Sequence, residues 1–131
     1  MKDRRDDAGV PDADELRAAL RAHVREMAGE EDVELEGELT GEFLHGLPVL
    51  LADLQQGAEH GDQEILRRSA HTLKSHAVLF GATALEARTR EIEGAAARGD
   101  DVDLALVAGV VADARGIASV LAPEPTATLA E

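Results

Sequence analysis

Apolar residues recur at every third or fourth position along most of the chain, which is the spacing of one face of an α-helix. Five segments show this pattern, and short polar or glycine-containing turns separate them. The predicted helices span residues 13–28, 34–59, 62–80, 82–98 and 101–121. Helices that are joined by such short turns pack as antiparallel neighbours. The pattern therefore predicts an all-α fold, an antiparallel four-helix bundle with an additional N-terminal helix.

The expected core consists of the residues that share the apolar face of each segment. They are Leu16, Leu20, His23 or Val24, and Met27 in the first segment; Leu39, Phe43, Leu47, Leu50 or Leu51, and Leu54 in the second; Leu66, Ala70, Leu73, Ala77 and Phe80 in the third; Leu85, Thr89, Ile92 and Ala96 in the fourth; and Leu104, Val107, Val111, Ala114, Ala118 and Leu121 in the fifth. Gly81 is expected to end the third helix in a tight turn. Residues 1–12 and 123–131 lack this periodicity, so we expect disordered ends around a bundle of residues 13–122.

Composition and charge exclude several classes of function. The chain has 131 residues, no cysteine and a formal net charge of −14, which excludes disulfides and thiolate metal sites and disfavours nucleic acids and anionic membranes as partners. A phosphate-binding glycine loop, a GxSxG motif and an HExxH motif are all absent from the sequence, so an ATP-using enzyme is not expected. The N-terminal residues form no apolar leader, and no later run approaches the roughly 20 apolar residues of a membrane span. We therefore expect a cytoplasmic protein.

His71 is the candidate for chemistry in the third predicted helix. It lies about 160° around the helix from Leu73, so it points to solvent, whereas His76 lies about 60° from Leu73, at the edge of the core. These two histidines are five residues apart and cannot share a metal ion, and no metal site is predicted. Arg67, Arg68 and Lys74 lie within about one turn of His71. Such a group of cations favours an uncharged, nucleophilic imidazole and suits an anion bound at the ring.

The sequence from residue 70 to 100, AHTLKSHAVLFGATALEARTREIEGAAARGD, resembles histidine-containing phosphotransfer (HPt) domains. The pattern of that family is approximately aHxLKGsaxxlGaxxLxxxcxxLExxaxxgd. Gly81, Leu85, Glu93 and the Gly99-Asp100 pair are in register with it, and the resemblance continues upstream through EFLHGLPVLLADLQQGAEHGDQEILRRS, so that it covers residues 39–100. The resemblance implies an antiparallel four-helix bundle in which the active histidine is exposed in the middle of a helix.

The resemblance also implies a role for individual residues. His71 is the phospho-accepting residue and Lys74 stabilises the phosphoryl group. Receiver domains of response regulators or hybrid histidine kinases are the expected partners. A receiver brings its own Mg²⁺, so no cofactor is expected in this chain, which acts as a phosphotransfer protein and a monomer without independent catalytic activity. The expected docking residues around His71 are Arg67, Arg68, Ser75 and Val78.

Two residues depart from the family pattern, and other functions stay open. Ser75 replaces the usual glycine and should limit how closely a receiver approaches, while His76 replaces a small residue and is expected to pack between helices. A docking module that binds a receiver or kinase without being phosphorylated is the main alternative. A small histidine-dependent enzyme would need a pocket and a carboxylate that orients the imidazole, and no spacing in the sequence indicates one. A helical assembly protein would bury the face of His71 in an oligomer.

Overall fold

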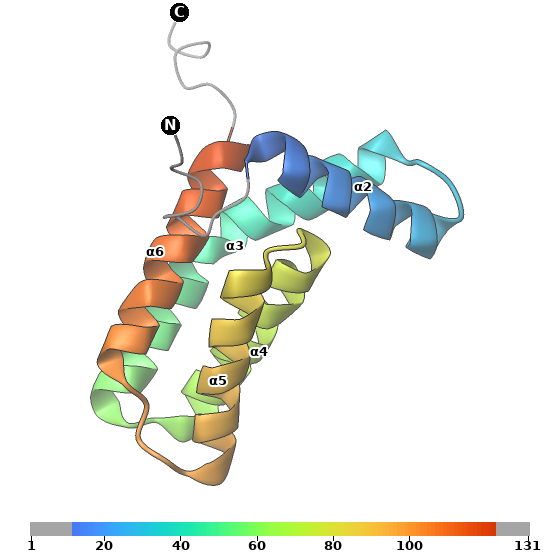
Figure 1. Ribbon diagram of the computed structural model, residues 1–131. Helices are drawn as coiled ribbons and strands as arrows, with labels where there is room; N and C mark the ends of the chain where they lie inside the picture. Colours follow the sequence, from blue (N-terminus) through green and yellow to red (C-terminus); the bar gives the residue numbers. More distant parts are fainter. Residues whose placement is uncertain (1–11, 123–131) are drawn as a thin grey trace, which may run out of the picture.

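The fold is a bundle of four helices with a fifth helix across one end (Figure 1). The computed structural model describes residues 12–122 and has no strand among them. Its helices are α2 (Ala13–Ala28), α3 (Val33–His60), α4 (Gln63–Leu79), α5 (Thr83–Arg98) and α6 (Leu104–Leu121). Helices α3 to α6 form the bundle, so the predicted all-α fold class is confirmed. The predicted disordered ends, 1–12 and 123–131, lie outside the described residues except for Asp12.

Helix α2 begins at a capping box. The Asp12 side chain accepts a hydrogen bond from the backbone N–H of Glu15, and the Glu15 side chain accepts one from the backbone N–H of Asp12. The helix ends at Gly29, whose φ of 83° is left-handed. The buried residues of α2 are Leu16, Leu20 and Val24, as predicted. The prediction for Met27 is wrong, because the last turn of α2 extends past the bundle and leaves this residue 60% exposed (Figure 1).

Helix α3 is one continuous helix of 28 residues that contains Pro48. Asp32 caps its start, since the Asp32 side chain accepts a hydrogen bond from the backbone N–H of Leu35. Proline lacks the backbone donor and bends a helix. Figure 1 shows the corresponding change of direction between the first part of α3, which runs beside α2, and the second part, which runs beside α6.

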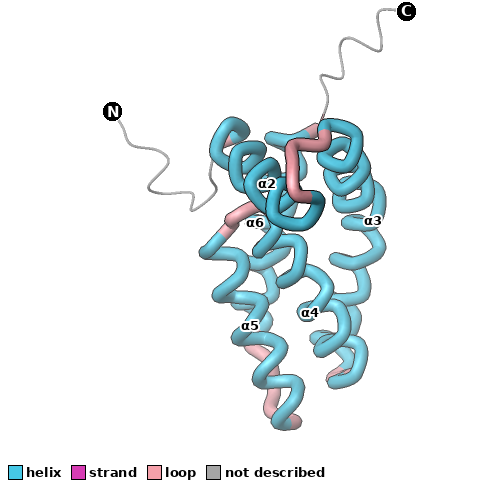
Figure 2. The backbone as a smooth tube through the Cα atoms, turned by 90° about the vertical axis from the view of Figure 1, so that its right-hand side faces the viewer, coloured by secondary structure: helices cyan, strands magenta, loops and turns pink. Residues whose placement is uncertain are grey.

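Helices α4 and α5 form a tight helical hairpin that contains the predicted functional residue (Figure 2). All five predicted core residues between Leu66 and Phe80 are buried, and so are the four predicted in α5. The connection depends on Gly81, which has a φ of 67°, and on a hydrogen bond from the N–H of Ala82 to the carbonyl of Ala77. A Cβ atom on Gly81 would lie 2.9 Å from the Cβ of Ala19, so this turn also touches α2.

Helix α6 starts three residues later than predicted. The Asp103 side chain accepts a hydrogen bond from the backbone N–H of Ala105 and so fixes the start at Leu104. Leu104 lies in this first turn and is 58% exposed, which contradicts its predicted place in the core. The helix also buries Val110, Ile117 and Asp113, which the periodicity did not predict. Asp113 forms an ion pair with Arg88 of α5.

Helix α6 is the most apolar helix that the structure describes. By length and composition alone it could cross a membrane, with a mean hydropathy of 1.8 over 18 residues, so the expectation that no segment approaches a span is corrected. Core helices of bundles pass the same test. Val107, Val111 and Ala114 of α6 are buried in the core of this bundle.

A substitution of Gly81 should reveal the contact between the α4–α5 turn and α2. Gly81→Ala places a side chain on a left-handed residue and against Ala19, whereas Gly61→Ala places one on a residue with the same φ of 67° but with open space around it. We expect Gly61→Ala to lower the free energy of unfolding by about 1 kcal/mol through backbone strain. Gly81→Ala should cost about 1 to 3 kcal/mol more, because Ala19 of α2 or the turn itself must also shift.

Urea denaturation of both variants and the wild type measures this difference. Equal losses for the two variants would show that α2 does not pack on the turn in this way.

Candidate functional site

His71 lies exposed in the middle of α4. Its side chain is 60% exposed, while Leu73, two residues further along the helix, is fully buried. The solvent-facing position predicted from helical spacing is therefore correct. Ala70 and Leu73 are buried in the core, so the packing of α4 against the bundle places the imidazole at the surface.

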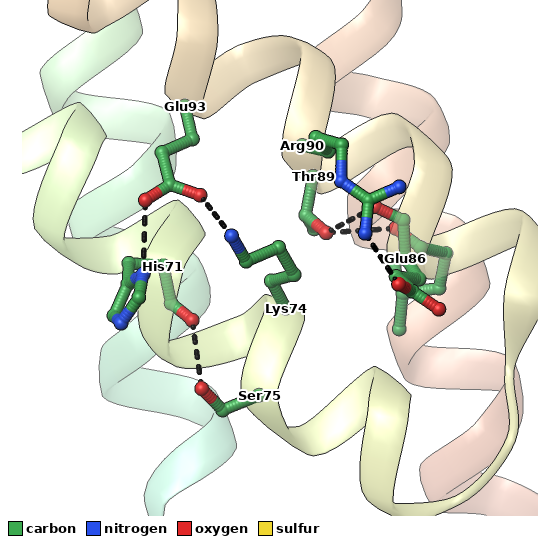
Figure 3. Close-up of polar contacts among 8 residues, drawn as sticks. His71, Lys74, Ser75, Glu86, Thr89, Arg90 and Glu93 are labelled. Carbon is green, nitrogen blue, oxygen red and sulfur yellow. Dashed lines mark hydrogen bonds and ion pairs between the residues drawn. The ribbon is translucent and has the colours of Figure 1, made fainter.

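One nitrogen of the His71 ring is engaged by a carboxylate from the next helix (Figure 3). The distance from Nδ1 of His71 to Oε2 of Glu93 is 2.9 Å. An ionised carboxylate only accepts hydrogen bonds. Nδ1 therefore carries the proton and donates a hydrogen bond to Glu93. In a neutral imidazole the other nitrogen, Nε2, then has a free lone pair. Glu93 therefore orients the ring and determines which of its nitrogens keeps a free lone pair.

Lys74 binds the second oxygen of the same carboxylate. Its Nζ lies 2.7 Å from Oε1 of Glu93, and both side chains are largely covered, at 24% and 21% exposed. The hydrogen bond from Lys74 lowers the pKa of the Glu93 carboxyl; burial acts in the opposite direction, and the hydrogen bond from His71 lowers it further. Glu93 is thus ionised at neutral pH and links His71 and Lys74 across the α4–α5 hairpin.

This role of Glu93 was not predicted from the sequence. Glu93 is in register with the HPt pattern, but no spacing along the chain indicates a carboxylate that orients the imidazole. The spacing around the turn between the two helices could have indicated this contact. His71 and Glu93 lie eleven residues to either side of position 82, between α4 and α5. In an antiparallel pair of helices, residues at equal distances from the turn lie at the same level.

The predicted group of cations is present, but carboxylates from the same chain accompany it. Arg67 and Arg68 both approach Oε2 of Glu64, at 3.8 Å and 4.0 Å. Arg67 and Arg68 are 48% and 64% exposed, and Glu64 is 67% exposed. Ion pairs this exposed contribute little to stability. The surface beside His71 therefore carries both signs of charge, because Glu64 lies next to the two arginines.

Comparison with known families assigns the chain. The sequence model of the Hpt domain matches residues 38–117, which is more than half of the chain and includes α4 and α5 entirely. The chain belongs to the Hpt domain family. Comparisons with curated proteins and with solved structures found no match. Hpt domains are helical bundles that act in histidine phosphotransfer in two-component signalling and interact with receiver domains.

Ser75 departs from the Hpt pattern beside the candidate histidine, but its side chain turns back onto its own helix. The hydroxyl group donates a hydrogen bond to the backbone carbonyl of His71, with an Oγ to O distance of 3.2 Å. Ser75 and Val78 are both exposed on the face of α4 that bears His71. The serine hydroxyl group is thus turned toward the backbone of its own helix (Figure 3).

His76, the second departure, is part of the packing beneath this helix in the Hpt domain. Its ring meets Phe43 of α3 edge-on, with 5.2 Å between centroids, and Phe43 also packs on Phe80 at 5.2 Å. Burial lowers the pKa of His76, and the nearby Glu42 carboxylate opposes that shift only in part. The expected packing role is confirmed.

The other histidines lie apart from this site. His23 contacts the carbonyl of Ala19 through Nδ1 at 3.0 Å, and His45 and His60 are exposed on α3. Between residues 12 and 122, no three His, Asp or Glu side chains come together as ligands for a metal ion. His71 and Glu93 are the only His–carboxylate pair within 4.0 Å among these residues.

The Hpt domain should lose stability as the pH falls below about 6.5. His76 has a lowered pKa in the folded state and an ordinary value of about 6.5 when unfolded. Below that pH the unfolded chain binds more protons than the folded one, so protonation favours unfolding. Above that pH this contribution to stability is fully present. His76→Gln should remove this part of the pH dependence.

The free energy of unfolding is measured at pH 7.5 and 5.5 for the wild type, for His76→Gln and for the control His45→Gln, which changes an exposed histidine of α3. If His76→Gln loses as much stability between the two pH values as the wild type and the control do, the assignment is wrong.

Proposed function

We propose that this protein is a phosphorelay intermediate. His71 accepts a phosphoryl group from the aspartyl phosphate of one receiver domain and passes it to the aspartate of another. The observation that carries the proposal is the orientation of the imidazole. The His71 side chain is 60% exposed, Nδ1 is bound by Glu93, and Nε2 points away from Glu93 (Figure 3). An exposed nucleophile suits a reaction in which a second protein supplies the rest of the active site.

The proposed transfer needs no proton to leave the ring. The lone pair of Nε2 attacks the phosphorus atom, the N–P bond forms, and the bond from phosphorus to the aspartate oxygen breaks to release a carboxylate. The ring then carries a positive charge, shared with the Nδ1–H group. Glu93 accepts the hydrogen bond from that group at 2.9 Å, and its negative charge stabilises the ring as the positive charge develops. In the reverse step the same proton stays in place, and imidazole leaves as a neutral group.

Lys74 supplies the positive charge next to the phosphoryl group in this proposal. Its ammonium lies three residues from His71 on the same face of α4 and is bound to Glu93 at 2.7 Å. A lysine is a flexible point charge that can exchange one anionic partner for another. A phosphoryl group on His71 adds negative charge next to Lys74. The Lys74 ammonium can then bind the phosphoryl oxygens, because it already lies beside the ring in its ion pair with Glu93.

The receiver supplies the Mg²⁺ and the acidic pocket in which the aspartate reacts, so this protein is a carrier and needs no ATP site. Arg67, Arg68, Ser75 and Val78 form the proposed docking face on α4, and the exposed positions of all four are compatible with that role. Bringing the nucleophile and the phosphorylated aspartate into line is the main contribution of docking. We place the relay in the cytoplasm and expect the protein to act as a monomer.

The decisive test is phosphoryl transfer to His71. The wild type, His71→Gln and the control His45→Gln are incubated with a panel of phosphorylated receiver domains and Mg²⁺. We expect phosphate that is labile in acid and stable in base on the wild type and on His45→Gln, and none on His71→Gln. A second receiver added afterwards should remove the label from the protein.

Label on His71→Gln would disprove the assignment of the nucleophile. Binding of receivers without label on the wild type would favour the docking module that is not phosphorylated.

A further inference from the structure

The face around His71 extends across the hairpin onto α5, where the side chain of Arg90 is exposed. Arg90 lies three residues before Glu93 on α5, so the two share one helical face. Arg90 and Lys74 are each eight residues from position 82, which places Arg90 level with Lys74 across the hairpin. Figure 3 shows Arg90 on the far side of Lys74 from His71.

The ion pair of Arg90 differs from the other pairs around His71 in its exposure. Nη2 of Arg90 lies 2.6 Å from Oε2 of Glu86, one turn earlier on α5. The Arg90 side chain is 63% exposed, but Glu86 is only 25% exposed. The positive group therefore faces solvent and its partner is largely covered. Arg67 and Arg68 instead share Glu64, which is 67% exposed, so an approaching protein meets both signs of charge there.

We propose that Arg90 is a docking residue for the receiver domain, with Glu86 as the residue that positions it. This inference rests on the proposed function. The partner it fits is a receiver whose rim, beside the acidic pocket, presents a carboxylate opposite α5. Arg90 gives the partner a cation on the α5 side of His71, and docking then spans both helices of the hairpin. Charge complementarity of this kind mainly raises the association rate and selects among partners.

A charge reversal within the pair tests the proposal. The double variant Glu86→Arg with Arg90→Glu keeps the net charge of the chain and can re-form an ion pair on the same helix, but it presents an anion where the wild type presents a cation. The control is Arg25→Glu with Glu31→Arg, which reverses an exposed ion pair between the last turn of α2 and the turn that follows it. Arg90→Ala removes the cation without adding an anion. Circular dichroism and urea denaturation establish that each variant is folded.

The second-order rate constant for transfer from phosphorylated receivers is measured at about 0.05 M and about 0.5 M salt. For at least one receiver that labels the wild type, we expect the α5 reversal to lower this rate about tenfold at low salt and much less at high salt, where charges are screened. Arg90→Ala should lie between the reversal and the wild type, and the α2 reversal should match the wild type.

If every receiver that labels the wild type labels the α5 reversal at the same rate, the role of Arg90 is disproved and the relay function still holds. A loss that is equal at both salt concentrations would also overturn the role, because it would indicate altered packing instead of lost charge attraction. If no receiver labels the wild type, the relay function itself fails. Equilibrium binding of unphosphorylated receivers to the same variants then tests the docking role of Arg90 without transfer.

Discussion

The carboxylate of Glu93 is the interaction on which the proposed site depends. It binds Nδ1 of His71 with one oxygen and Nζ of Lys74 with the other, at 2.9 Å and 2.7 Å. The contact joins α4 to α5, so the geometry of the site is set by the packing of the hairpin. The turn at Gly81 fixes the level at which the two helices meet, and a small change there would move the carboxylate away from the imidazole.

This arrangement explains how an exposed side chain can be well oriented. An imidazole at 60% exposure has few packing contacts to hold its ring, and a hydrogen bond to a partly covered carboxylate replaces them. The remaining face of the ring stays open to a partner. The protein also carries a net charge of −14, which repels acidic proteins, so in the proposed relay the exposed cations near His71 would supply the local attraction for an acidic receiver.

Helical spacing predicted the fold and the exposure of His71, because the buried positions of α4 and α5 follow one regular stripe. It failed at Met27 and Leu104, which continue the apolar pattern at the ends of their helices, where no neighbouring helix covers them. The contact between Glu93 and His71 also could not be predicted from the residue pattern within one helix. A contact between residues 22 positions apart depends on how two helices align, and so does the exposure of Arg90 relative to its partner.

The position of the proton on the His71 ring tests whether Glu93 leaves the lone pair of Nε2 free. Two-bond proton–nitrogen correlations in the NMR spectrum of the labelled protein identify which imidazole nitrogen carries the proton. We expect a proton on Nδ1 of neutral His71 in the wild type, and a shift of population toward the Nε2–H form in Glu93→Gln. A proton on Nε2 in the wild type would contradict this expectation, since the nitrogen assigned as the nucleophile would then have no lone pair available.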